Sequence, residues 1–373
     1  MPSFASDVSF LERHGDVQVL RDRDGRRIAV SAQYQARVMT SAVSDEGQSL
    51  GWVNRNFIES RKVGTPFDNY GGEDRFWLGP EGGQYAIFFA PGAEFELAAW
   101  QTPAGFQEGA WEVTHQDERS LDFRRDLSVR SRAGFTFEVG VERRVALLDA
   151  TELAETLAVP AGVEWVAFGS ENRITNTGRT PWSEQTGLIS VWSLGMFVPS
   201  DDTWVIAPYE RDAGGPIVNS DYFGALPPER LRLDEQAGTV TFLADGRYRS
   251  KIGLPQARSK PVAGSYTPSE NLLTLVRYSV PSEPQPFVNS TWAEQDAPFG
   301  GDLFNAYCHG TSTPGPLADV RFYELESSSP GARLSPGESL RHDHQTFHFL
   351  GEHEALDAIA RQALGVALTS LAR

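Results

Sequence analysis

The feature that most limits the possible folds is a strict alternation of side chains over residues 135–142. Phe135, Phe137, Val139 and Val141 alternate with polar residues or glycine. A period of two is typical of a β-strand that has one face in the core and the other in water. Further runs rich in β-branched and aromatic residues predict strands at Ala86–Phe89, Leu121–Val129, Glu164–Phe168, Leu188–Leu194, Thr239–Leu243, Leu272–Val280 and Phe322–Glu326.

The spacing of these strands predicts one large domain rather than several small ones. Strands recur from start to finish without the strand–helix alternation of a parallel sheet, and no long linker interrupts them. Because 40% of the residues are hydrophobic and 22 are Phe, the chain can fill a large core. We therefore expect an all-β, mainly antiparallel fold: a large β-sandwich that spans residues 1–373 as a single domain.

Two segments predict helices. The first is short, at Thr151–Leu157, and the second is C-terminal. Apolar residues repeat every three to four positions in the second segment, at Leu356, Ile359, Ala363, Ala367 and Leu371. This apolar stripe predicts a helix that packs on the sheet as a lid. A seam between two subunits is the alternative, and the oligomeric state stays open.

Charge and cysteine content exclude several classes of function. A formal net charge of -17 without a basic run argues against nucleic acid and anionic membranes as partners. No run of apolar residues is long enough to cross a membrane, and residues 1–16 lack the features of a signal peptide, so we expect a cytoplasmic protein. The single Cys308 excludes an internal disulfide and a thiolate metal cage, and no cofactor is predicted.

Three consecutive C-terminal stretches resemble a known family. They are Phe322–Pro330, which contains two glutamates, the turn at Leu334–Leu340 and the strand-like Arg341–Phe349. Together they resemble the end of aldose-1-epimerase (galactose mutarotase)-like proteins. Residues 71–83, 172–178 and 187–197 are similar to an uncharacterised bacterial subfamily of that superfamily. The resemblance implies a fold called a supersandwich and a sugar-sized cleft, and hence a carbohydrate ligand.

Two glutamates are the candidate catalytic carboxylates. Mutarotation needs a base for the anomeric hydroxyl and an acid for the ring oxygen, both facing the same sugar. On a strand, Glu324 and Glu326 point to the same side, roughly 7 Å apart. By its position in the motif, Glu326 is the predicted base and Glu324 a neighbour that binds hydroxyls or raises the pKa of the base. A solvated strand face is the alternative.

The acid is the position at which the sequence departs from the family. The resemblance implies a histidine in the middle of the chain, but the matching region, Trp182–Leu188, has none. His309 and His344 are the substitute candidates, although isolated histidines are more often structural. The alternative function is a non-catalytic sugar-binding module of the same fold.

Sugar-binding residues are expected mainly from the glycine-rich run at residues 71–83. Glycines allow a ligand to approach the backbone, an aromatic ring can stack on a sugar, and a guanidinium donates to hydroxyls. A buried arginine–carboxylate network that braces a loop would explain the same run. The predicted set is Glu73, Asp74, Arg75, Trp77, Asn305 and Arg341.

A histidine cluster supports a rival hypothesis from another class. His342, His344 and His348 would share one face of a strand and could hold a metal. Together with the preceding Pro336-Gly337 they are similar to the first motif of the cupins, small metal-binding jelly rolls. The motif's usual glutamate is absent here, so a cupin-like metal-binding protein is the lesser alternative and no metal ligand is assigned.

Overall fold

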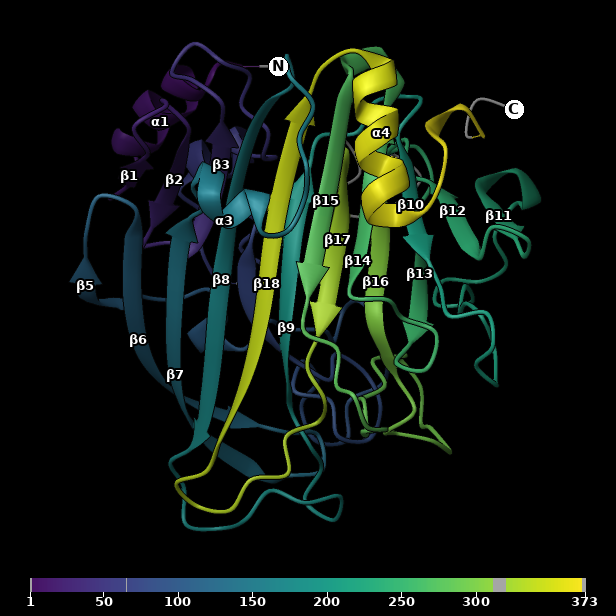
Figure 1. The fold of residues 1–373 in the computed structure, drawn as a ribbon. Coiled ribbons are helices and arrows are strands. Elements are labelled where there is room, and N and C mark those ends of the chain that lie inside the picture. The colour runs from purple at the N-terminus through teal and green to yellow at the C-terminus, as the bar shows by residue number, and fades with distance from the viewer. Residues whose placement is uncertain (1, 65, 311–319, 371–373) are drawn as a thin grey trace.

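The computed structural model describes residues 2–64, 66–310 and 320–370, which form three antiparallel sheets (Figure 1). The largest sheet has ten strands, and every pairing between its strands is antiparallel. In spatial order these are β11 (Leu231–Asp234), β12 (Thr239–Leu243), β10 (Trp204–Pro208), β14 (Val262–Thr267), β15 (Leu272–Tyr278), β18 (Ser339–Leu350), β8 (Glu164–Asn176), β7 (Thr136–Leu147), β6 (Ser120–Arg130) and β5 (Glu112–Gln116).

Two smaller sheets accompany it. The five-stranded sheet consists of β13 (Ser250–Pro255), β16 (Asp302–His309), β17 (Phe322–Ser328), β9 (Ser190–Phe197) and β4 (Arg75–Gly79), in that order. The three-stranded sheet consists of β1 (Gln18–Arg21), β2 (Arg27–Ser31) and β3 (Arg37–Ala42). The helices of the described residues are α1 (Phe4–Glu12), α2 (Arg55–Ser60), α3 (Ala150–Ala154) and α4 (His353–Leu364), with 3₁₀ turns at Ala104–Phe106, Pro228–Arg230, Pro268–Glu270 and Leu368–Ser370.

The ten-stranded and five-stranded sheets pack face to face, and the core lies between them. Val205 and Val276 of the large sheet, for example, pack in one apolar cluster with Leu325 of β17. A second cluster, in which side chains of β6–β8 pack mainly on those of residues 20–111, contains Phe76, Phe123 and many other apolar residues. This architecture is the expected antiparallel β-sandwich of the mutarotase type.

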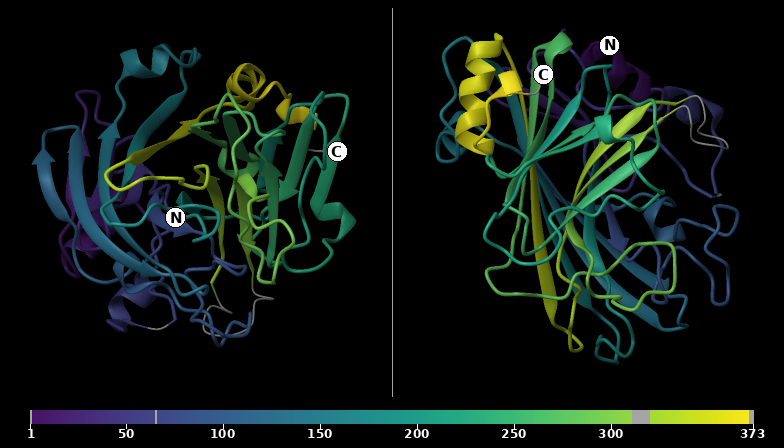
Figure 2. Two further views of the ribbon diagram at one scale, coloured as in Figure 1. Left: turned by 90° about the horizontal axis from the view of Figure 1, so that it is seen from below. Right: turned by 90° about the vertical axis from the view of Figure 1, so that its right-hand side faces the viewer.

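The C-terminal helix α4 packs on the outer face of the ten-stranded sheet, across β10, β14 and β15 (Figures 1 and 2). Leu356 and Ile359 are fully buried against this face, as the predicted lid requires. The helix ends earlier than its stripe suggested, because Gly365 adopts a positive φ of 72° that terminates it. Ala367 therefore follows the helix, and Leu371 lies outside the described residues.

The other local predictions have mixed outcomes. The alternating run at 135–142 lies in β7 from Thr136 onward. Of the seven other predicted strands, all but Ala86–Phe89 overlap observed ones. Ala86–Phe89 is not a strand: the segment is buried in the aromatic core, and only Phe89 forms an isolated bridge, to Trp100. The predicted helix at Thr151–Leu157 is the shorter α3, whose start is fixed by a capping box on Asp149.

Candidate functional site

A cavity of about 550 Å³ opens on the face of the five-stranded sheet that points away from the ten-stranded sheet. We call it the central cavity. Alternate residues of five paired strands point into it, because successive side chains of a strand lie on opposite faces. They are Arg75 and Trp77 of β4, Trp192, Leu194 and Met196 of β9, Lys251 of β13, Tyr307 and His309 of β16, and Phe322, Glu324 and Glu326 of β17.

Glu326 is held at the floor of the central cavity by two donors. Trp192 Nε1 and Lys251 Nζ both donate to its Oε2, at 2.9 and 2.8 Å. The side chain is almost fully buried, and its Oε1 has no hydrogen-bond partner among the described residues. Because a buried carboxylate oxygen without a donor is costly, this oxygen is suited to accept a proton or a hydrogen bond from a ligand.

Glu324 lies two residues away on the same face and pairs with Arg75. The guanidinium NH2 of Arg75 is 2.5 Å from its Oε1, and both side chains are buried. Burial raises the pKa of Glu324 to about 7, although the positive charge of Arg75 opposes this shift. The floor thus holds two carboxyl groups in different environments, one of them able to carry a proton near neutral pH.

Further charges at the floor are coupled to this pair. Burial lowers the pKa of Lys251, but the negative charges of Glu326 and Glu81 outweigh burial and keep that pKa above its usual value. Burial also raises the pKa of the Glu81 carboxyl, which lines the same cavity. The lysine therefore stays protonated and acts as a fixed positive charge beside Glu326.

Aromatic rings form the walls. Trp77 and Trp192 meet edge to face, with ring centroids 5.7 Å apart, and Trp100 and Trp292 also line the cavity. Arg75 lies 4.3 Å above the Trp77 ring, a cation–π contact that holds the guanidinium in place. Walls of this kind offer flat apolar faces beside a charged floor, the combination that sugars with apolar C–H faces and polar edges require.

His309 and Asn305 lie on the same face of the sheet at different depths. His309 lines the cavity, stacks on Phe322 with centroids 4.6 Å apart, and shares a 2.8 Å hydrogen bond with the Tyr307 hydroxyl. In the ladder it lies four residues from the level of Glu326, roughly 13 Å along the strands. Asn305 is opposite Glu326 but does not line the cavity, and it donates to the Tyr222 hydroxyl and to the Ile252 carbonyl.

The structure does not bring Glu73, Asp74 and His344 together with Glu326. They lie in the interior, where Glu73 pairs with His348 at 3.0 Å and Asp74 with Arg143 at 3.0 Å. His344 bonds to Ser327, whose side chain lies on the opposite face of β17 from Glu326. For Glu73 and Asp74, this placement agrees with the alternative in which the run at 71–83 contributes buried networks. Arg75 and Trp77 of the same run do line the cavity.

The three histidines of β18 do share one face, as their alternation predicted. His342 and His344 both bond to the Ser327 hydroxyl, at 2.8 and 2.9 Å, while His348 bonds to Glu73 and Thr274. Burial lowers the pKa values of His342 and His344, so both are neutral near pH 7. Within the described residues, no group of three or more His, Cys, Asp or Glu side chains could hold a metal ion.

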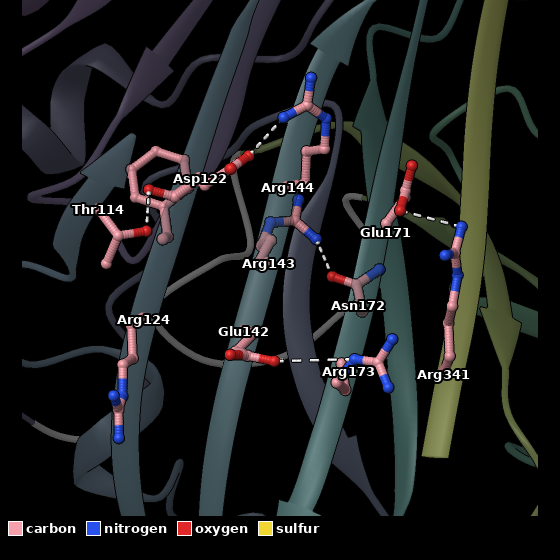
Figure 3. Close-up of a pocket in the computed structure, with 11 residues that line it drawn as sticks. Thr114, Asp122, Arg124, Glu142, Arg143, Arg144, Glu171, Asn172, Arg173 and Arg341 are labelled. Atoms are coloured by element: carbon pink, nitrogen blue, oxygen red, sulfur yellow. Dashed lines mark hydrogen bonds and ion pairs between the residues drawn. The ribbon is translucent and has the colours of Figure 1, made fainter. Parts of the chain in front are cut away.

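Arg341 lies in a second, separate groove on the outer face of the ten-stranded sheet (Figure 3). There it pairs with Glu171 at 2.9 Å, and Arg144 pairs in the same way with Asp122. Outward side chains of β6, β7, β8 and β18 alternate in charge along this groove, so the pairs largely neutralise one another. Arg341 is therefore remote from the central cavity.

Lys251 and Trp192 were missed by the sequence reasoning. Lys251 lies 75 residues before the glutamate to which it donates. No local pattern marks it, because β13 is buried along most of its length and lacks alternation. A signal was present for Trp192, since it lies in a stretch that resembles the bacterial subfamily.

Solved structures share the fold. A candidate aldose 1-epimerase from Escherichia coli K12 is 14% identical, with a TM-score of 0.53 over 89% of this chain and 98% of that one. The Slr1438 protein of Synechocystis sp. PCC 6803 is 16% identical, with a TM-score of 0.52 over 91% and 96%. A galactose mutarotase related enzyme from Lactobacillus acidophilus is 9% identical, with a TM-score of 0.50 over 89% and 97%.

The chain thus has the fold of these aldose 1-epimerase-like and galactose mutarotase-like structures. It belongs to the family of unknown function DUF6786, whose model matches residues 2–373. No curated protein is significantly similar in sequence. Among the described residues, no helix is long and apolar enough to span a membrane.

Proposed function

We propose that the protein binds a carbohydrate in the central cavity and acts on it as an aldose-1-epimerase-like enzyme, with Glu326 as the base. The observation that carries this proposal is the unequal hydrogen bonding of the two oxygens of the Glu326 carboxylate. One oxygen is fixed by Trp192 and Lys251, and the other is buried without a partner in the described structure. The likeness of the fold to proteins described as aldose epimerases and mutarotases supports a sugar as the ligand.

The chemistry follows from the two carboxyl groups. Glu326 takes the proton of the anomeric hydroxyl while Glu324, protonated, donates to the ring oxygen, and the bond between the anomeric carbon and the ring oxygen breaks. The open aldehyde then turns about its neighbouring C–C bond, and the reverse proton transfers close the ring in the other anomer. A pKa of about 7 suits Glu324 to this role, and it lies much closer to Glu326 than His309 does.

Glu326→Gln tests the base. The substitution preserves the shape of the side chain but removes the proton acceptor, so we expect anomeric exchange to slow by at least about a hundredfold. Exchange between the two anomers of D-glucose and D-galactose is measured by NMR exchange spectroscopy, and binding by calorimetry. Glu171→Gln, the same change on the outer face of the large sheet, is the matched control and should leave the rate unchanged.

The two remaining outcomes separate the hypotheses. If wild-type protein accelerates exchange and Glu326→Gln does so equally well, Glu326 is not the base. If wild-type protein binds a sugar in the cavity without accelerating exchange, the non-catalytic sugar-binding module is the correct function.

A further inference from the structure

The central cavity changes character from floor to mouth. The charged groups at the floor, among them Lys251 and Glu326, are buried. At the mouth lie three exposed apolar side chains from three separate loops: Val63, Leu97 and Phe223 are 74%, 44% and 38% exposed. Large apolar side chains are seldom left in water as a cluster around one opening, so this rim indicates an apolar contact surface for something that enters the cavity.

The cavity is larger than a single sugar ring. Even at about 30 Å³ per non-hydrogen atom, the share of a water molecule in the liquid, the twelve such atoms of a hexose take up about 360 Å³. The cavity volume of about 550 Å³ exceeds this generous allowance. A hexose placed at the floor would therefore leave space unfilled between itself and the rim.

The charges that line the cavity balance one another. Four carboxyl groups and four basic side chains line it: Asp68, Glu81, Glu324 and Glu326, and Lys62, Arg75, Arg249 and Lys251. At the floor, Arg75 pairs with Glu324 and Lys251 with Glu326. The lining therefore has no excess of positive charge that would favour an anionic ligand.

From these three observations we infer that the ligand is a reducing sugar that carries an uncharged, apolar group at the end remote from its anomeric carbon. This inference rests on the proposed function, which places the anomeric centre beside Glu326. The apolar group then projects from the floor to the rim, where Leu97 and Phe223 contact it. The polar floor selects the sugar, and the rim selects its substituent.

A set of probes with one reducing end tests the inference. D-glucose, its neutral 4,6-O-benzylidene derivative and glucose 6-phosphate differ only at the remote end, and the galactose series covers the other common configuration. We expect the benzylidene sugar of the accepted series to bind about tenfold more tightly than the parent hexose, by burial of its phenyl ring. The 6-phosphate should bind more weakly than the benzylidene sugar, because a phosphate gains nothing from contact with the apolar rim. Binding is measured by isothermal titration calorimetry.

A rim variant shows where the preference arises. Leu97→Gln should lower the ratio of benzylidene-sugar to hexose affinity by about threefold to tenfold. Leu233→Gln is the matched control, because Leu233 is similarly exposed, at 47%, but lies outside the cavity. Equal binding of hexose and benzylidene sugar, tighter binding of the 6-phosphate than of the benzylidene sugar, or an unchanged ratio in Leu97→Gln would overturn the inference.

The rate measurements keep this inference distinct from the proposed function. Selective binding of the benzylidene sugar without accelerated anomeric exchange would contradict the proposed enzyme and leave the inferred ligand class standing. If exchange of both sugars is accelerated but hexose and benzylidene sugar bind with equal affinity, the proposed enzyme stands and the inferred ligand class is contradicted. Failure of every probe to bind would overturn both.

Discussion

At the residue scale, Asp302 shows how the fold sets the chemistry of one buried carboxyl group. It starts β16, accepts hydrogen bonds from Tyr222 and from Asn219 (3.4 Å), and is 9% exposed. Burial raises the pKa of Asp302 to about 6, above its usual 3.8, while these donors and Lys251 oppose the shift. The folded state therefore holds this proton more tightly than the unfolded state does.

This carboxyl should make the free energy of unfolding depend on pH. Its contribution is most favourable below about pH 4 and is lost as the pH rises through about 6, at a cost of about 3 kcal/mol. Asp302→Asn keeps an acceptor for Tyr222 without a titrating group, so the decline between pH 4 and 6 should be smaller in this variant. Urea unfolding at several pH values checks this prediction, with the exposed Asp212→Asn as control. Identical slopes for wild type and Asp302→Asn would contradict it.

The residues of the site were predictable only where the chain itself brings them together. Glu324 and Glu326 could be placed on one face because a strand fixes residues two apart. In the same way, Arg75 and Trp77 could be placed on one face of a strand. The sequence does not tell which face of that strand meets the cavity. Lys251 depends on the pairing of β13 with β16, a long-range contact that no local pattern records.

At the scale of elements, helix α4 should contribute strongly to stability through its buried stripe. Leu356 is fully buried in a cluster with Ile206 and Leu273 of the large sheet. Leu356→Ala should lower the free energy of unfolding by about 2–5 kcal/mol, because it removes apolar contacts and leaves a cavity. Denaturant unfolding measures this loss. Gln362→Ala, an exposed change on the same helix, should stay within about 0.5 kcal/mol of wild type; equal effects would show that the helix is not anchored by its stripe.

A strand with one face in water gave the clearest prediction, although the fully buried β9 was also predicted and the exposed β5 was not. β7 has one wet face, and its alternation made it the clearest element of the sequence. β3 and β4 are buried at every position, so their sequences carry no period of two. The sequence reasoning missed both, and it also missed β16, which is buried at all but one position. The strand predicted at Ala86–Phe89 is wrong, because this apolar run is buried without pairing as a strand.

At the scale of the whole molecule, the order of strands favours one cooperative unit. β18, the last strand of the chain, lies between β8 and β15, so it joins the two halves of the ten-stranded sheet (Figure 1). Loss of this strand would leave two unpaired edges. We therefore predict that the single domain expected for residues 1–373 unfolds in one step. Tryptophan fluorescence and far-ultraviolet circular dichroism should give coincident urea transitions, whereas two separated transitions would indicate independent domains.

The two faces of β17 have a consequence for how the protein can change through evolution. Even-numbered Glu324 and Glu326 serve the cavity, while odd-numbered Ser327 bonds to His342 and His344 of the opposite sheet. Substitutions at even positions can therefore alter the chemistry of the site without touching the bonds between the sheets. A single inserted or deleted residue would exchange the two sets and place carboxylates in the interior. New specificities in this lineage should thus arise at β17 by replacement of side chains, never by a change in the length of the strand.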